Sequence, residues 1–271
     1  MFSHYKNVTC CSRYNWLQII ITQIRDNLPV THSLSANEKL LQVLIHIAAS
    51  NVPLQAQQLS AEMEMPISSL YRYLALLRDW NLIEENHGRN TYSAGPAALQ
   101  LQRNFDMNSP LPDGVRPILK RLQQQTGEMS AYMVAVGFNA LCVDSIDSPY
   151  ALRCSYEKGQ SQPLIRGASA KVILAYLPLA RQLTILEHYD ITESQQIDTW
   201  IAELDLIKQD GFAISTSEID VGVSGVSAPV FVGNKVVGAV SVMAPAERIN
   251  SRKNKIVMCV LQAARALPPQ H

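Results

Sequence analysis

Residues 35–92 read SANEKLLQVLIHIAASNVPLQAQQLSAEMEMPISSLYRYLALLRDWNLIEENHGRNTY, and they carry the start and stop signals of three helices followed by a short hairpin. Ser35 and Glu38 form a capping box, in which the serine hydroxyl and the glutamate carboxylate satisfy each other's free amide groups at a helix start. Leucine and isoleucine side chains then recur on one helical face as far as Ala48. Pro53 ends this first predicted helix.

Two further helices are predicted in the same stretch. The second is short, over residues 54–63, and the third begins beside Pro66 and extends to Trp80. Proline suits the first turn of a helix because that position needs no amide hydrogen. The apolar stripe expected on the third helix consists of Ile67, Leu70, Leu74 and Leu77. The opposite face of this helix is then free for other contacts.

That opposite face is polar and carries Ser68, Ser69 and Arg72, with Tyr71 at its edge. Hydroxyl groups and a helix N-terminus can bind phosphate, and an arginine can donate two parallel hydrogen bonds to a guanine edge in the major groove. Taken singly, each amphipathic helix is equally expected in a small hydrophobic core. The ordered combination favours a helix-turn-helix that contacts double-stranded DNA.

A short hairpin is predicted directly after the third helix. Residues 82–85 and 91–93 flank the turn 87–90, whose sequence His-Gly-Arg-Asn has the composition of a hairpin loop. Arg89 lies at the predicted tip, where it could hold a phosphate. The stretch 35–95 therefore predicts a winged helix-turn-helix domain, with an operator as its partner.

The charge of this half of the chain is neutral. Residues 1–106 hold eight Lys and Arg against eight Asp and Glu. Because neutralised phosphates supply most of the nonspecific affinity for DNA, a single copy of this domain should bind weakly. We therefore expect a homodimer or homotetramer, in which several copies bind together.

Composition and cysteine use indicate the class of protein. The chain has 271 residues, 47% of them hydrophobic, and 23 Lys and Arg balance 23 Asp and Glu. This length suits two domains, and the balance shows no bias toward acidic partners. Five cysteines without a CxxC pair or metal-ligand spacing indicate free thiols in a reducing cytoplasm, with no metal site and no cofactor.

Residues 1–34 lack the pattern of a signal peptide, and the apolar run at 16–21 is too short to span a membrane. We expect a cytoplasmic protein without a membrane contact. The first 34 residues are expected to be an N-terminal extension without regular structure, or an over-extended reading of the translation start.

The second half of the chain alternates helices and strands. A helical linker is predicted over residues 96–114, and an α+β domain over 115–268. In that domain we predict a first helix ending at Thr126, strands at 129–136, 140–146, 151–156, 212–216, 226–232 and 235–243, and helices at 168–177, 193–209 and 251–267. Such layers leave room for a small-molecule pocket.

Several motifs of the chain resemble those of IclR-type transcriptional regulators, in the same order and over residues 35–268. They are MPISSLYRYL (65–74), QTGE (125–128), GASAKVILA (167–175), DVGVSGVSAPVF (220–231) and GAVSVMAPAERI (238–249). The resemblance implies a winged helix-turn-helix followed by a GAF-like mixed α/β effector-binding domain. It also implies a repressor or activator that binds an operator as a dimer or pair of dimers and is switched by a small organic acid.

The same resemblance implies which residues line the effector pocket. The ligand carboxylate would be held by the backbone amides of Ala168 and Ser169. Ser215 stands where relatives often carry an acid, and Gly225 where several carry cysteine. Relatives often carry two serines on the last strand of the domain. Here one of them is Ser241, and Met243 stands in place of the other. These changes predict a less polar pocket, whose ligand is a carboxylate with a substantial apolar part.

Two other functions stay open on sequence alone. An enzyme is not expected, because the chain has no GxSxG elbow, P-loop or GxGxxG motif. Lys171 is the one candidate for a Schiff base, although a solvated lysine on a helix face is the simpler interpretation. The other alternative is a ligand-binding sensor without operator-specific DNA binding, which the neutral first half would suit.

Overall fold

The computed structural model describes residues 35–86, 88–108 and 114–267. The predicted N-terminal extension, His87 in the predicted turn and the loop at 109–113 in the predicted linker lie outside these ranges. Apart from residues 49–51, the chain divides into two compact units at Gly95 and Pro96.

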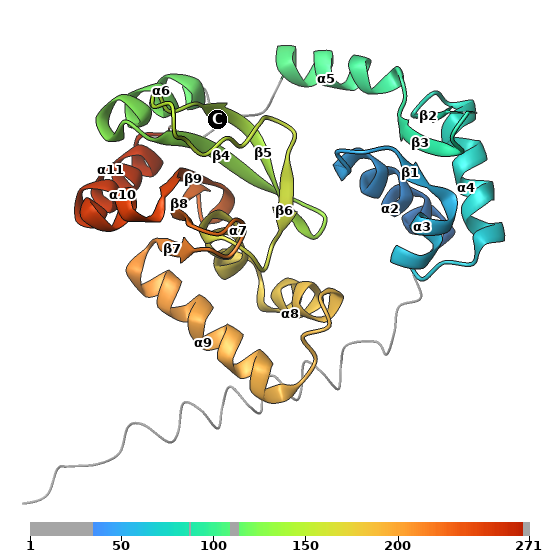
Figure 1. The fold of residues 1–271 in the computed structure, drawn as a ribbon. Helices are drawn as coiled ribbons and strands as arrows, with labels where there is room; N and C mark the ends of the chain where they lie inside the picture. The colour runs from blue at the N-terminus through green and yellow to red at the C-terminus, as the bar shows by residue number, and fades with distance from the viewer. Residues whose placement is uncertain (1–34, 87, 109–113, 268–271) are drawn as a thin grey trace, which may run out of the picture. The chain divides into compact units, whose positions relative to one another are not determined.

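The first unit is a three-helix winged fold (Figure 1). Its elements are α2 (Ala36–Ala49), β1 (Leu54–Gln55), α3 (Ala56–Glu62), α4 (Ile67–Asp79), β2 (Ile83–Asn86) and β3 (Thr91–Ala94). The predicted capping box is confirmed, since the Ser35 amide donates to Glu38 Oε2 at 2.8 Å and the Glu38 amide donates to Ser35 Oγ at 3.3 Å. The predicted hairpin is confirmed too, because β2 and β3 pair antiparallel.

Two details of this unit differ from the prediction. Leu54 and Gln55 begin a strand, not a helix, because they pair antiparallel with Tyr92 and Thr91 of β3 and complete a three-stranded sheet. A pairing partner so far along the chain leaves no local signal.

The buried stripe of α4 is also shifted from the one we predicted. Ile67, at the first position of the helix, is 39% exposed, whereas Tyr73 is only 7% exposed. The buried side chains of α4 are Leu70, Tyr73, Leu74 and Leu77, and they fit one helical face. Ile67 is thus left at the surface, on the same helix as the predicted DNA contacts.

The second unit is built on one six-stranded antiparallel sheet with the strand order β6-β5-β4-β9-β8-β7 (Figure 1). Its strands are β4 (Met129–Val136), β5 (Asn139–Ile146), β6 (Ser161–Pro163), β7 (Ala213–Thr216), β8 (Val223–Val232) and β9 (Lys235–Pro245). Its helices are α5 (Ala97–Asn108), α6 (Val115–Thr126), α7 (Ala168–Tyr176), α8 (Leu179–His188), α9 (Ser194–Asp210), α10 (Ala246–Ser251) and α11 (Lys253–Ala266).

Each face of the sheet carries its own hydrophobic core. On β4, Tyr132 packs with residues of α6 and α11, whereas Met129, Ala131 and Met133 pack with residues of α7 and α9. This alternation follows from the two-residue period of a strand. The sheet therefore separates α6 and α11 from α7 and α9.

Four parts of this unit differ from the prediction. Residues 151–156 form no strand; the carbonyl oxygens of Leu152 and Tyr156 accept hydrogen bonds from the side chains of Arg248 and Cys142 instead. Helix α8 and strand β6 were not predicted at all. The closing helix expected at 251–267 is confirmed as α11, and a short helix that was not predicted, α10, begins directly after β9.

Candidate functional sites

The polar face of α4 is open to solvent. Ser68 and Arg72 are exposed, Ser69 is partly exposed, and Tyr71 is 46% exposed. The Arg72 guanidinium lies 5.5 Å from the centre of the Tyr73 ring and forms no ion pair with a described residue. Its donors are therefore available to another molecule.

The wing is attached to α4 through an ion pair. Arg78 Nη1 donates to Glu85 Oε2 of β2 at 2.5 Å. At the turn, the Gly88 amide donates to Asn86 Oδ1 at 3.2 Å and the Arg89 amide to Asn86 O at 3.0 Å. Both bonds use backbone amides as donors, and the Arg89 side chain is exposed.

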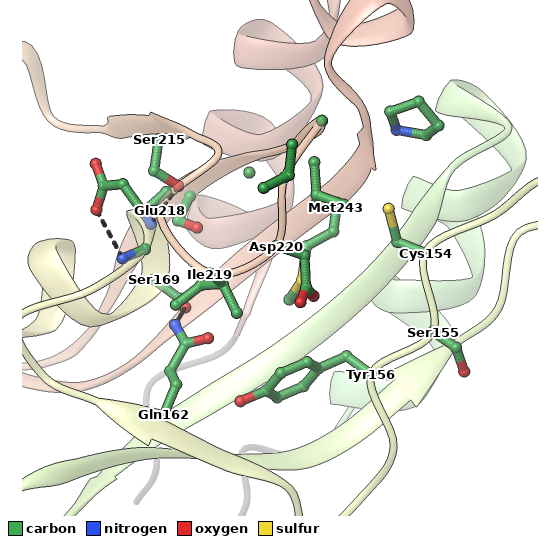
Figure 2. A pocket seen from close by; sticks show the side chains of 18 of the residues that line it. Cys154, Ser155, Tyr156, Gln162, Ser169, Ser215, Glu218, Ile219, Asp220 and Met243 are labelled. Atoms are coloured by element: carbon green, nitrogen blue, oxygen red, sulfur yellow. Dashed lines mark hydrogen bonds between the residues drawn. The ribbon is translucent and has the colours of Figure 1, made fainter.

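The second unit contains a cavity of about 460 Å³, lined by the start of α7, the loop between β7 and β8, strands β8 and β9, and residues 152–156 (Figure 2). Five of the six predicted ligand residues line it: Ala168, Ser169, Ser215, Gly225 and Met243. Ser241 does not line it. Its Oγ accepts a hydrogen bond at 2.8 Å from Ser227, which does.

The cavity also holds two carboxylates that were not predicted. Glu218 and Asp220 of the β7–β8 loop both line it. They follow the position of the missing acid, Ser215, by three and five residues. The sequence shows both acids in one predicted loop. It does not show that this loop passes over the start of α7.

The chain's own groups occupy part of the helix start of α7. The Ala168 amide donates to Ser215 Oγ at 2.9 Å, and the Gly167 amide donates to Glu218 Oε2 at 3.0 Å. No hydrogen bond to the Ser169 amide is made by the described residues, although Ser169 Oγ accepts one from Gln162 Nε2 at 3.1 Å. Among the amides expected to hold a ligand, that of Ser169 is thus the one still open.

Lys171 is held between two carboxylates. Its Nζ lies 2.8 Å from Glu203 Oε1 and 2.9 Å from Glu218 Oε1, and 5.4 Å from the centre of the Trp200 ring. Burial by itself lowers the pKa of Lys171, but the hydrogen bonds that its ammonium donates to the two carboxylates outweigh this effect and raise the pKa above its ordinary value. A lysine that stays protonated is a poor Schiff-base former.

The opposite wall of the cavity comes from the irregular segment. Burial raises the pKa of the Cys154 thiol and, more strongly, that of the Tyr156 phenol, so both groups stay neutral. The Tyr156 hydroxyl oxygen is buried and makes no hydrogen bond with any described residue. Figure 2 shows Asp220 and Met243 close to this wall. This wall therefore brings two neutral polar groups next to a carboxylate and a thioether.

A buried ionic cluster anchors this wall. Glu128 is fully buried and accepts hydrogen bonds from Arg248 Nη2 at 2.8 Å and Arg252 Nη2 at 2.5 Å. Arg248 Nη1 in turn donates to Leu152 O at 3.0 Å. The cluster connects the end of α6 and helices α10 and α11 to the segment that lines the cavity.

The first unit is a winged helix whose third helix has an exposed polar face. The second is an α+β unit with a cavity of small-molecule size. This combination defines a class of DNA-binding regulators that carry an effector domain. The chain belongs to the IclR family of bacterial transcriptional regulators: the IclR helix-turn-helix domain matches residues 37–87, and the C-terminal domain of the bacterial transcriptional regulator IclR matches residues 108–268. The protein is accordingly a DNA-binding transcriptional regulator.

Relatives of similar length agree with this assignment. The regulator BhcR of Paracoccus denitrificans is 25% identical over 239 residues, which cover 86% of this chain and 85% of that protein. The transcriptional repressor IclR of Escherichia coli is 23% identical over 248 residues, which cover 88% of this chain and 90% of that protein. Both relatives are transcriptional regulators.

Solved structures show the same fold. An IclR-type regulator from Silicibacter superposes with a TM-score of 0.72 at 22% identity, over 86% of this chain and 94% of that one. The C-terminal domain of a transcriptional regulator from Vibrio cholerae is 55% identical, with a TM-score of 0.57, over 60% of this chain and 99% of that one.

No helix in the described ranges is long and apolar enough to cross a membrane.

Proposed function

We propose that the protein binds an operator through α4 and the wing, as a repressor or an activator. In this proposal Arg72 contacts a base edge in the major groove, with Tyr71 beside it, and Ser68, Ser69 and Arg89 contact phosphates. The observation that carries the proposal is the exposed Arg72, which no described carboxylate pairs. By contrast, Arg78 on the same helix is paired with Glu85.

The effector proposed for the cavity is a small organic molecule with a carboxylate and an apolar part. The open Ser169 amide and the Ser215 hydroxyl support the carboxylate end, because a helix start favours anions. Met243 and the small Gly225 support the apolar part. The volume of about 460 Å³ is within the range of small-molecule sites.

The proposed active form is a homodimer or homotetramer in the cytoplasm. The support is the neutral charge of residues 1–106, which gives one DNA-binding unit little nonspecific affinity. Two linked units would share one operator and gain affinity without new contacts.

A gel-shift titration with the intergenic DNA next to the protein's own gene tests this function. A specific complex that survives excess unrelated DNA is expected. Binding of equal strength to any sequence, or no binding, would instead favour a ligand sensor without an operator. The zero net charge of residues 1–106 is the observation that favours such a sensor.

A further inference from the structure

Glu218 places one of the chain's own carboxylates at the start of α7. Its Oε2 accepts a hydrogen bond from the Gly167 amide at 3.0 Å, drawn as a dashed line at Glu218 in Figure 2. Its Oε1 accepts one from the Lys171 ammonium at 2.9 Å. A backbone amide at a helix start and an ammonium are the two groups that an external carboxylate would also seek. Glu218 thus makes the contacts expected of a bound anion.

Glu218 also attaches the β7–β8 loop to α7. The base of the loop is closed by bonds of Ser217, whose amide donates to Val223 O at 2.8 Å and whose Oγ accepts the Gly222 amide at 3.0 Å. Beyond this base, Val221 is 94% exposed. Besides Glu218, the Ile219 side chain lies against Gly167, where a Cβ would be 3.3 Å from Ile219 Cγ1.

Exchange of this carboxylate is sterically possible. The Glu218 side chain is 29% exposed, and both Glu218 and Gly167 line the cavity. Lys171 would keep Glu203 at 2.8 Å if Glu218 left, so its largely buried charge would not lose every partner. An unpaired buried charge is what usually makes such an exchange unfavourable.

We propose that Glu218 is an internal competitor for the effector site: in the effector-free protein it holds the Gly167 amide, next to the open Ser169 amide, and an effector carboxylate that binds at this helix start displaces it. This inference rests on the effector site proposed above. Displacement frees the β7–β8 loop from α7. It also lowers the apparent affinity for any small carboxylate, so that only an effector with further contacts in the cavity binds well.

Chemical rescue with acetate tests this inference on the full-length protein. Thermal unfolding of the wild type, Glu218→Ala and Glu203→Ala is followed in increasing sodium acetate, with sodium chloride at equal ionic strength as the salt control. Glu218→Ala is expected to unfold at a lower temperature and to be stabilised saturably by acetate, with an apparent affinity at least about tenfold above that of the wild type.

Glu203→Ala is the matched control, because it removes the other carboxylate at Lys171 but leaves Glu218 on the Gly167 amide. It should gain no acetate-specific stabilisation. Should Glu218→Ala not fold even in acetate, Glu218→Gln carries the test, because it keeps the size and loses the charge. It too should bind acetate more tightly than the wild type.

Equal acetate responses in the wild type and the Glu218 variants would overturn the inference. Operator binding by the wild type is measured separately, so the two proposals can fail independently. Acetate rescue without operator binding would remove the proposed function and keep the internal competitor. Operator binding without rescue would do the reverse.

Discussion

The Ala168 amide donates a hydrogen bond to the Ser215 hydroxyl at 2.9 Å, and both residues are buried. The bond joins the start of α7 to β7 across 47 positions of sequence. Ser215 acts here only as an acceptor, so its own proton remains available to a ligand. The pair forms one wall of the cavity, and a carboxylate beside the Ser169 amide could accept a hydrogen bond from Ser215.

Gly225 limits what can fit beside this pair. A Cβ there would lie 3.5 Å from Ser215 Oγ and 3.6 Å from Ala168 Cβ, which is ordinary contact. Gly225→Ala should therefore be tolerated, whereas the side chain of Gly225→Leu must extend into the cavity. In a thermal-shift screen of organic carboxylates, the leucine variant should lose every response of the wild type and still bind the operator. A normal response in that variant would refute the cavity assignment.

Arg72 and Arg89, both exposed, should act differently. Arg72→Ala is expected to cost roughly 1 to 3 kcal/mol at one operator position and to relax the base preference there. Arg89→Ala should weaken binding to all sequences alike and reduce the salt slope by about 1. Titrations of operator variants at several salt concentrations measure both effects.

Arg78→Ala is the matched control for these arginines, because its guanidinium is already paired with Glu85. It should leave the base preference unchanged. If Arg72→Ala behaved like this control, base reading by Arg72 would have to be abandoned.

The cluster at Glu128 should contribute strongly to the stability of the second unit. Glu128→Ala leaves two guanidinium groups without their buried carboxylate, and breaking such a pair costs roughly 3 to 5 kcal/mol. Arg116→Ala is the control, since Arg116 is 68% exposed in its pair with Asp144 and should change stability by only about 0 to 1 kcal/mol. Urea unfolding measures the difference, and equal losses would argue against the cluster as an anchor.

Local signals explain which parts of the fold were predictable. Ser35 and Glu38 mark a helix start with residues three positions apart, and the structure contains that capping box. Leu54 forms a strand because Tyr92 pairs with it. Leu152 is not part of a strand, and its carbonyl oxygen accepts a hydrogen bond from Arg248 instead. Such partners lie far along the chain, so no local pattern reports them.

The cavity shows the same limit. Five of its lining residues were reached through motifs, since a resemblance carries positions over one by one. Glu218 was missed because its role depends on the path of a loop over Gly167. Ser241 does not line the cavity but is hydrogen-bonded to Ser227, which does. The alternation of side chains along a strand does not show which of two such residues reaches the cavity.

His188 should give the second unit a dependence on pH. Its ring stacks on Phe138 at 3.7 Å, and burial followed by the nearby Arg181 charge holds its pKa below the ordinary 6.5. The folded protein therefore binds fewer protons than the unfolded chain, and this contribution is complete above pH 6.5 and lost as the pH falls through the folded pKa. His188→Phe should show a smaller drop in unfolding temperature between about pH 7.5 and 5.5. An unchanged drop would exclude His188 as its source.

Assembly follows from the weak binding expected of one neutral DNA-binding unit. The protein should be at least dimeric by light scattering at the concentrations used for DNA binding. Dilution should then reduce operator occupancy more steeply than a single-site isotherm, because the assembly is lost with it. A monomeric mass together with simple one-site binding would contradict this expectation.

Footprinting on the intergenic DNA next to the protein's own gene tests the central claim most directly. The wild type should protect two half-sites related by a two-fold axis, with the recognition helices one or more helical turns apart. Arg72→Ala, at the same concentration, should lose that protection while its effector unit stays folded. No protection by the wild type, or the same footprint with both proteins, would contradict operator reading by α4.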